Sequence, residues 1–160
     1  MAERLAAFGR TLVFLIFVPA TVAIFVPEII LSRVPGGAPL VPGLGLVLVA
    51  LGIVSWFWAG VGFSFVGRGT PSPLDAPREL VVWGPYRWTR NPMYIAVLAV
   101  ILGVAVATSS LALLAYAVLI FCAFHLFVVA YEERTLERRF GASYLEYKRH
   151  VPRWIPRPPR

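Results

Sequence analysis

The sequence predicts an all-α membrane protein with about four transmembrane helices. Of its 160 residues, 59% are hydrophobic and only 14% are charged, whereas about 25% of the residues in a typical soluble domain are charged. Four long apolar stretches carry almost no charge, and nearly all the basic residues lie between or beside them. Lipid is therefore the expected solvent for most of the chain, and the length predicts a single membrane domain over residues 1–160.

The four apolar stretches cover residues 11–31, 40–66, 92–107 and 111–131. A spanning helix needs about 20 residues, and the first, second and fourth stretches reach that length. Pro19 and Pro27 should kink the first one. The third stretch is short, so either it starts beneath the headgroups or it forms, with the fourth, a hairpin that stops short of the far surface. We favour a hairpin that reaches the far interface, because its Thr108-Ser109-Ser110 turn is uncharged.

The basic residues are distributed on one side of the predicted spans. If the chain crosses the membrane an even number of times, all but one of the 15 lysines and arginines lie on the same side of it. Only Arg33 falls in a loop on the opposite side. The positive-inside rule then predicts that both termini are cytoplasmic. We expect the membrane to be the inner (cytoplasmic) membrane of a bacterium.

The net charge of +7 raises the question of a nucleic-acid partner. The basic residues flank apolar stretches and form no long solvated stripe, so anionic membrane lipids are the expected partners and nucleic acid is not. Cys122 is the only cysteine, which excludes an intrachain disulfide and a thiolate metal cluster, and no metal site is predicted.

Glycines recur in the second apolar stretch, where small residues let helices approach closely in lipid. We expect all of them to serve helix packing. They are Gly43, Gly45, Gly52, Gly60 and Gly62.

Two polar segments are not explained by membrane spanning, and the first covers residues 84–94. Gly84-Pro85 predicts a turn, and Asn91-Pro92 predicts a helix N-cap followed by proline at the first helical position. The N-terminus of a helix collects unpaired N–H groups, which suit an anion. Arg90 beside it adds a side chain that can bind a carboxylate with two hydrogen bonds.

Aromatic residues accompany this segment and have two interpretations. Tyr86, Trp88 and Tyr94 could stack on a flat ring of a ligand. Alternatively, they form an aromatic belt at the membrane interface, with Arg90 extending along it toward water.

The second polar segment covers residues 131–134, where the fourth stretch leaves the membrane. Acids beside a bilayer are costly, so Glu132 and Glu133 either bind a cation such as an ammonium or sulfonium, or form a salt-bridged helix surface with arginines such as Arg134 or Arg138. The two acids point about 100° apart on a helix, so one should face the bundle and the other water.

His125 lies seven residues before Glu132 and shares its helix face. A histidine inside a span is a functional candidate, and an interhelical hydrogen bond is the alternative. Beyond the acids, Phe140-Gly141 should end the helix, and the spacing from Ser143 to Glu146 is that of a capping box. A short cytoplasmic interfacial helix is therefore expected there, folded back over the acids.

The polar segments carry a family resemblance. The patterns are Gly84-Pro-Tyr-Arg-x-x-Arg-Asn-Pro-Met-Tyr94 and Glu132-Glu133-x-x-Leu136-x-x-x-Phe140-Gly141-x-x-Tyr144-x-x-Tyr147-x-x-x-Val151-Pro152-Arg153. Together they resemble the isoprenylcysteine carboxyl methyltransferase family, and phospholipid methyltransferases share a looser version. The resemblance implies an integral membrane methyltransferase with two N-terminal spans over residues 1–66 and a methyltransferase-like core over residues 67–160.

The resemblance also implies a cofactor, S-adenosylmethionine, bound at the cytoplasmic end of the hairpin and released as S-adenosylhomocysteine. Arg90 and the adjacent helix N-terminus would hold its carboxylate, and Glu132 or Glu133 its ammonium. The family usually has histidine where this chain has Asn91, which cannot titrate, so a proton-transfer role there is in doubt. The implied cofactor-binding residues are Gly84, Pro85, Tyr86, Arg90, Asn91, Pro92, Tyr94, Glu132 and Glu133, and the catalytic candidates are Arg90, Glu132 and His125.

The expected methyl acceptor is hydrophobic and enters from the bilayer: an isoprenylcysteine-like carboxylate, a phospholipid amine or a small thiol. An amine would need a proton acceptor such as Glu132 or His125. The alternatives are an NADPH-dependent enzyme resembling membrane sterol reductases, which the acids disfavour because they repel phosphate, and a non-catalytic membrane scaffold.

Overall fold

The computed structural model describes residues 19–39, 41, 43–65 and 79–158, and within these ranges the chain forms helices and no strand. The predicted all-α class is therefore confirmed. In chain order the elements are the π-helical turn η1 (Thr21–Phe25), α2 (Val26–Arg33), α3 (Leu44–Phe65), the 3₁₀ turn η2 (Gly84–Arg87), α4 (Pro92–Ala107), α5 (Leu111–Phe127), the π-helical turn η3 (Val128–Glu132), α6 (Glu133–Phe140) and α7 (Ala142–His150).

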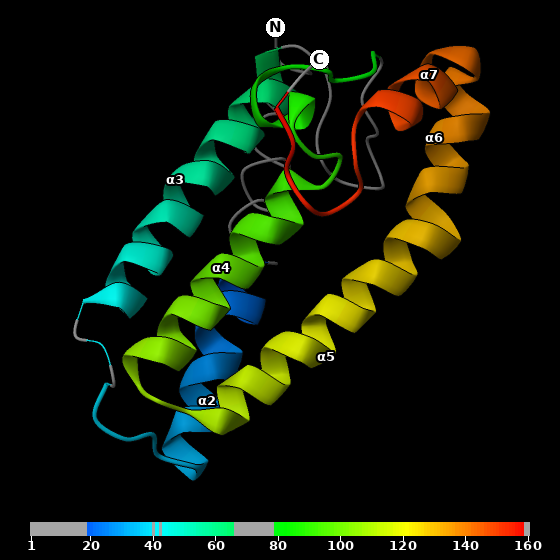
Figure 1. The fold of residues 1–160 in the computed structure, drawn as a ribbon. Helices are drawn as coiled ribbons and strands as arrows, with labels where there is room; N and C mark the ends of the chain where they lie inside the picture. The colour runs from blue at the N-terminus through cyan, green and yellow to red at the C-terminus, as the bar shows by residue number, and fades with distance from the viewer. Residues whose placement is uncertain (1–18, 40, 42, 66–78, 159–160) are drawn as a thin grey trace, which may run out of the picture.

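The long helices alternate in direction (Figure 1): α2 and α4 run one way, and α3 and α5 run the other. The closest pair is α3 with α4. From the turn that joins them, α4 and α5 diverge, and α7 folds back toward the start of α4 at the open end. Apart from Arg33, the basic residues of the described ranges lie in segments at this open end.

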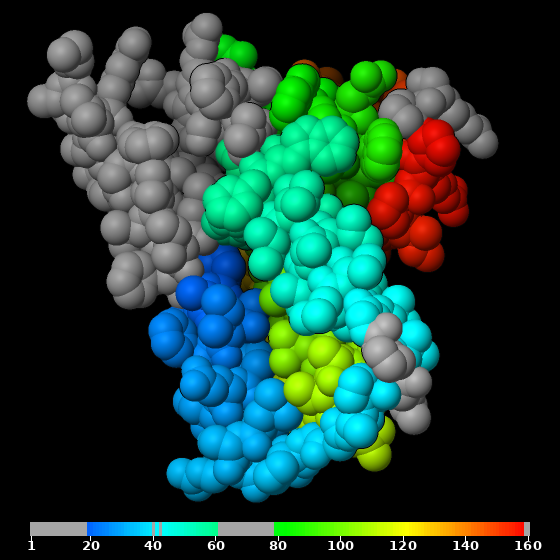
Figure 2. Space-filling model, turned by 90° about the vertical axis from the view of Figure 1, so that its left-hand side faces the viewer, coloured from blue at the N-terminus to red at the C-terminus, as the bar shows by residue number. Residues whose placement is uncertain are grey.

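The hairpin of α4 and α5 has the predicted turn at residues 108–110. Helix α4 covers Pro92–Ala107, the bounds of the third apolar stretch, and Ser110 caps α5 by accepting a hydrogen bond from the Leu113 N–H at 3.3 Å. The segment after α2 crosses this turn (Figure 2), where the Gly37 N–H donates to Thr108 O at 2.7 Å. This end of the hairpin is therefore fixed by loop contacts.

One helix among the described residues is long and apolar enough to cross a membrane: the continuous helix Leu111–Phe140, which has 30 residues. Two shorter apolar helices cover Leu44–Gly60 and Pro92–Ala107. The 16 residues of α4 extend only about 24 Å at 1.5 Å per residue. The first apolar stretch is described only from residue 19. Four crossings therefore remain a prediction.

The surface of the long helices is apolar, as a lipid environment requires. Leu111, Leu119 and Leu126 on α5 are 79%, 64% and 67% exposed, and many large apolar side chains on α3 are likewise exposed. A soluble monomer seldom exposes contiguous apolar surface on this scale. Inside, Ala23, Val97, Ile101 and Ala117 form a small core between η1, α4 and α5.

The kink predicted at Pro27 takes the form of a π-helical turn. In a regular α-helix the proline ring would clash with the carbonyl four residues earlier, that of Ala23. The turn η1 precedes it, and the Val26 N–H donates to Thr21 O, five residues back. The wider turn accommodates the proline without ending the helix.

Glycines bring α3 and α4 into close contact, as predicted for Gly45 and Gly52. A Cβ atom on Gly45 would lie 2.5 Å from Gly103 O, and one on Gly52 would lie 2.8 Å from Ala96 O. The packing role predicted for Gly43 is wrong: no atom of the described residues would lie within 4 Å of its Cβ, and it has a φ of +84° just before α3. Gly60 is buried, and the surroundings of Gly62 lie outside the described part.

The long helix ends at Phe140 as predicted, because Gly141 adopts a φ of +51°. The predicted capping box is wrong. Helix α7 begins at Ala142, one residue after the glycine, so that Ser143 lies inside the helix and no side chain caps its first turn. The sharp turn at Gly141 leaves no room for a separate cap.

The predicted topology can be tested at the hairpin turn. In a Ser109→Cys variant with Cys122 replaced by alanine, a membrane-impermeant maleimide added to intact cells should label residue 109 from outside, because four crossings place the turn on the far side from the charged end. Labelling that requires exposure of the cytoplasmic face would contradict the prediction of a fourth membrane crossing.

Candidate functional site

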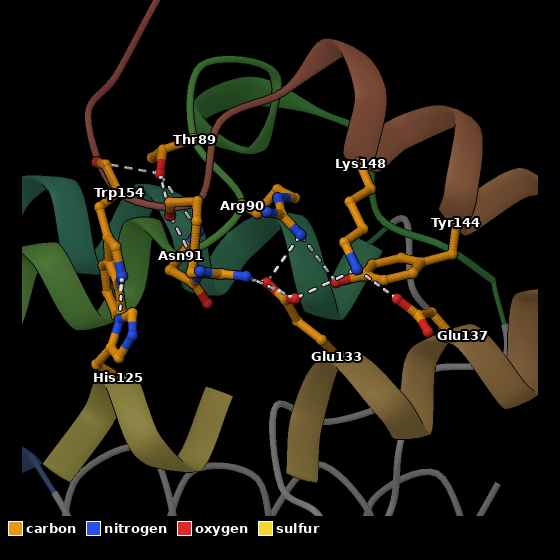
Figure 3. A network of polar contacts seen from close by, with 10 residues as sticks. Thr89, Arg90, Asn91, His125, Glu133, Glu137, Tyr144, Lys148 and Trp154 are labelled. Atoms are coloured by element: carbon orange, nitrogen blue, oxygen red, sulfur yellow. Dashed lines mark hydrogen bonds and ion pairs between the residues drawn. The ribbon is translucent and has the colours of Figure 1, made fainter. Parts of the chain in front are cut away.

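A buried carboxylate lies at the open end of the hairpin. Glu133, the first residue of α6, is 5% exposed. Its Oε1 atom accepts hydrogen bonds from Arg90 Nη1 at 2.8 Å and Arg153 Nε at 2.6 Å, and its Oε2 atom accepts one from Arg153 Nη2 at 3.0 Å. Lys148 Nζ is 3.6 Å from the same Oε2 atom. A buried charge is tolerated only when it is paired and hydrogen-bonded, so this cluster (Figure 3) holds several segments together.

Arg90 precedes α4, and its side chain is 9% exposed. Besides its bond to Glu133, Nη1 lies 3.4 Å from Tyr144 Oη. Burial raises the pKa of Tyr144 to about 12, so the phenol stays neutral and can accept this bond. The Nε atom of Arg90 is buried and has no hydrogen-bond partner among the described residues. One donor of a fixed guanidinium is therefore available.

Glu132 differs from its neighbour in its partners. Tyr94, in the first turn of α4, donates a hydrogen bond from Oη to Glu132 Oε2 at 2.9 Å. Glu132 is partly exposed and has no ion pair within the described ranges. Of the two acids, Glu133 is surrounded by cations and Glu132 is held by one phenol.

The prediction that one acid faces the bundle and the other faces water is wrong, since both contact the start of α4. The segment that leads into α4 reaches both acids, because Arg90 donates to Glu133 and Tyr94 donates to Glu132. The interpretation that Arg134 or Arg138 pairs with these acids is also wrong. Both arginines are exposed, and the cations beside Glu133 come from other segments.

The segment before α4 has the predicted turn at Gly84, which has a φ of +54°, and Asn91 and Pro92 hold the predicted N-cap and first helical positions. The Asn91 side chain does not cap the helix. Its Nδ2 atom donates to Arg153 O at 3.0 Å. Tyr86 is buried, which disagrees with a place in an interfacial belt, and its carbonyl accepts a hydrogen bond from Tyr147 Oη at 2.7 Å. Trp88 is 45% exposed.

The chain after α7 runs along this segment, and we refer to residues 151–157 as the C-terminal strap. Backbone bonds join the Arg90 N–H to Pro152 O at 2.9 Å and the Arg157 N–H to Trp88 O at 3.0 Å. Thr89 Oγ1 donates to Arg153 O at 2.9 Å. The strap therefore places the Arg153 side chain against Glu133.

His125 lies in α5, and within the described ranges it makes no hydrogen bond to Glu132, although the two were predicted to share a face. Its Nδ1 atom accepts a hydrogen bond from Trp154 Nε1 at 3.0 Å. The Trp154 ring also contacts Tyr94, with centroids 6.4 Å apart. The structure thus brings Arg90, Tyr94 and both acids together directly and connects His125 to them through the strap.

Sequence reasoning missed several residues of this site. Arg153 and Tyr144 stand inside the pattern that carries the family resemblance, and that pattern was the available signal for them. Lys148, Thr89 and Trp154 had no comparable signal, because their roles depend on how α7 and the strap fold back.

The sequence matches the family model described as phospholipid methyltransferase over residues 40–143. This range contains the first polar segment and both acids. The chain therefore belongs to the phospholipid methyltransferase family, whose members are membrane proteins and which the sequence resemblance had indicated.

Two curated relatives match the chain. The cobalt-zinc-cadmium resistance protein CzcN of Cupriavidus metallidurans is 34% identical over 120 residues, which are 75% of this chain and 51% of the relative. The nickel-cobalt-cadmium resistance protein NccN of Alcaligenes xylosoxydans xylosoxydans is 30% identical over 114 residues, which are 71% and 49% of the two chains. The chain spans about half the length of these relatives. No solved structure matches it significantly.

The names of these relatives raise the question of direct metal binding. Within the described ranges, no group of three or more histidine, cysteine, aspartate or glutamate side chains is placed to hold a metal ion.

The buried cluster predicts a large effect of one charge on stability. Glu133→Gln leaves Arg90 and Arg153 without their counter-ion, and breaking a buried ion pair costs about 3–5 kcal/mol. The free energy of unfolding of the Glu133→Gln variant should therefore be lower than that of the wild type by this amount, as measured by denaturant titration in detergent.

The matched control is Glu137→Gln, one turn further along α6. Glu137 is half-buried and pairs with Lys148 at 2.5 Å, so its loss should cost less than about 1 kcal/mol. Equal costs for the two variants would contradict the assignment of Glu133 as the central counter-ion.

Proposed function

We propose that this protein transfers a methyl group from S-adenosylmethionine to a hydrophobic acceptor that reaches the site from the bilayer. The observation that carries the proposal is that a buried Arg90, fixed by Glu133, and a partly exposed Glu132, held by Tyr94, lie at the same open end of a helical hairpin. These two side chains come from the two motifs of a methyltransferase family.

The charges of the site fit the amino-acid end of the cofactor. That end is a zwitterion and needs hydrogen-bond donors for its carboxylate and an acceptor for its ammonium. The buried Nε atom of Arg90 has no partner among the described residues, and a guanidinium suits a carboxylate. Among the described residues, Glu132 is engaged through Oε2 alone, which leaves Oε1 to accept from an ammonium.

The two acids then have separate roles. Glu133 is already paired with Arg90, Arg153 and Lys148, so in this proposal it holds Arg90 in position and does not contact the cofactor. Glu132, oriented by Tyr94, receives the ammonium. Asn91 uses its amide nitrogen on the strap and retains its amide oxygen as an acceptor for the ribose.

When bound, the cofactor supplies an electrophilic methyl group. The protein contributes position and the exclusion of water, because methyl transfer requires an in-line approach to that group. A carboxylate or thiolate acceptor needs no base, whereas an amine must release a proton, for which Glu132 is the nearby acceptor. The site lies at the end of the hairpin that carries most of the basic residues, so in this proposal it faces the cytoplasm.

The relatives' names suggest metal resistance, and in this proposal such a role would act through methylation of a membrane component. Their names do not indicate the methyl acceptor.

Calorimetry on the detergent-solubilised protein tests cofactor binding. The wild type should bind S-adenosylhomocysteine, and Glu132→Gln should weaken that binding about tenfold or more, the effect of losing a charge-assisted hydrogen bond. Glu137→Gln is the matched control and should bind like the wild type, since Glu137 pairs with Lys148.

Absence of heat from the wild type at millimolar ligand would contradict the proposal. Binding of NADPH in its place would favour a reductase. An undetectable response to either ligand in the wild type and in a variant lacking Arg90, Glu132 and Glu133 would favour a non-catalytic scaffold.

A further inference from the structure

The hydrogen bond between Trp154 and His125 defines the protonation of the histidine. An indole N–H can only donate, so His125 Nδ1, at 3.0 Å from Trp154 Nε1, must be the unprotonated acceptor. A neutral His125 then carries its proton on Nε2. It cannot take a proton at Nδ1 without losing the bond to Trp154.

The Trp154 side chain lies between the two helices of the hairpin (Figure 3). Its ring centroid is 5.2 Å from that of Phe121 and 6.1 Å from that of His125, both on α5. On α4 it contacts Tyr94, with centroids 6.4 Å apart. Tyr94 is the residue that orients Glu132, so Trp154 contacts one support of the proposed cofactor site.

Trp154 is also adjacent in the chain to Arg153, whose guanidinium donates to both oxygens of Glu133. Other hydrogen bonds of the strap go to the segment before α4, and the Val151 N–H donates to Tyr147 O in α7. The hydrogen bond to His125 joins the strap to α5, and the bonds from Arg153 join it to Glu133 further along the same continuous helix. Without it, the strap would be anchored to one side of the hairpin and to Glu133.

We infer that the hydrogen bond between His125 and Trp154 acts as a latch, which fixes the C-terminal strap across the open end of the hairpin. His125 is then a positioning residue, acting through Trp154 and Arg153, and not the proton acceptor of the reaction. The effect of the latch on catalysis rests on the proposed function. The existence of the latch does not depend on that function.

The second histidine of the chain provides an internal contrast. His150 Nδ1 lies 3.0 Å from Glu146 O, and a carbonyl oxygen can only accept, so this Nδ1 must carry a proton. The two neutral histidines should therefore be opposite tautomers. Nitrogen-15 NMR at about pH 8.5, above the ordinary histidine pKa of about 6.5, should resolve both forms, with His150→Gln assigning the signals. A protonated Nδ1 on His125 would overturn the latch.

Hydrogen exchange of the strap tests the latch and separates it from a catalytic role. Trp154→Phe and His125→Phe should each speed exchange of the Arg157 amide roughly fivefold, the effect of one lost hydrogen bond, and the double variant should add little more. His125→Asn keeps an acceptor near the Nδ1 position and should restore slow exchange. Tyr116→Phe removes a bond from α5 to Val22 O and should leave the strap unchanged.

Methyl-transfer kinetics complete the comparison. If the pair acts as a latch, the His125→Asn variant should retain methyl-transfer turnover. The Trp154→Phe and His125→Phe variants should each lose it. Unchanged strap exchange in all variants, with turnover lost equally in His125→Asn and His125→Phe, would overturn the inference and identify a proton acceptor. Failure of the wild type to bind S-adenosylhomocysteine would contradict the proposed function. The hydrogen-exchange measurements would still show whether His125 and Trp154 fix the strap.

Discussion

The buried carboxylate of Glu133 is the interaction on which the rest of the site depends. Arg90 comes from the segment before α4, Lys148 from α7 and Arg153 from the strap, and all three lie around this one acid. Because a buried charge is stable only with its partners in place, these segments must assemble together. Glu132 has Tyr94 as its hydrogen-bond partner within the described ranges, and in the proposed function it is the acid that receives the ligand.

The distribution of charge gives this cluster its place in the membrane. Apart from Arg33, the described basic residues lie at the open end of the hairpin, which is the end that the positive-inside rule assigns to the cytoplasm. The long helix Leu111–Phe140 passes from an apolar segment directly into the charged one. In the proposed function, the water-soluble cofactor would reach the site from the aqueous phase and the lipid-soluble acceptor from the bilayer.

Much of the fold could be predicted because it follows from local patterns. Apolar run lengths and the Asn91-Pro92 signal gave the bounds of α4, and small residues indicated the close contact at Gly45 and Gly52. The predictions failed where contacts beyond the local pattern decide: Arg90 and Tyr94, on either side of the start of α4, each bond one of the two acids, and the turn at Gly141 sets the start of α7 at Ala142. The partners of Glu133 were missed because Lys148 and Arg153 approach it only after α7 and the strap fold back.

The proposed methyl transfer to a membrane component requires Glu132. The most direct measurement incubates membranes containing the wild type or Glu132→Gln with methyl-labelled S-adenosylmethionine and counts label in the lipid-extractable fraction. The expected result is label in one lipid fraction with the wild type and a loss of about tenfold or more with the variant. No label above membranes that lack the protein, or equal label with the variant, would contradict the claim.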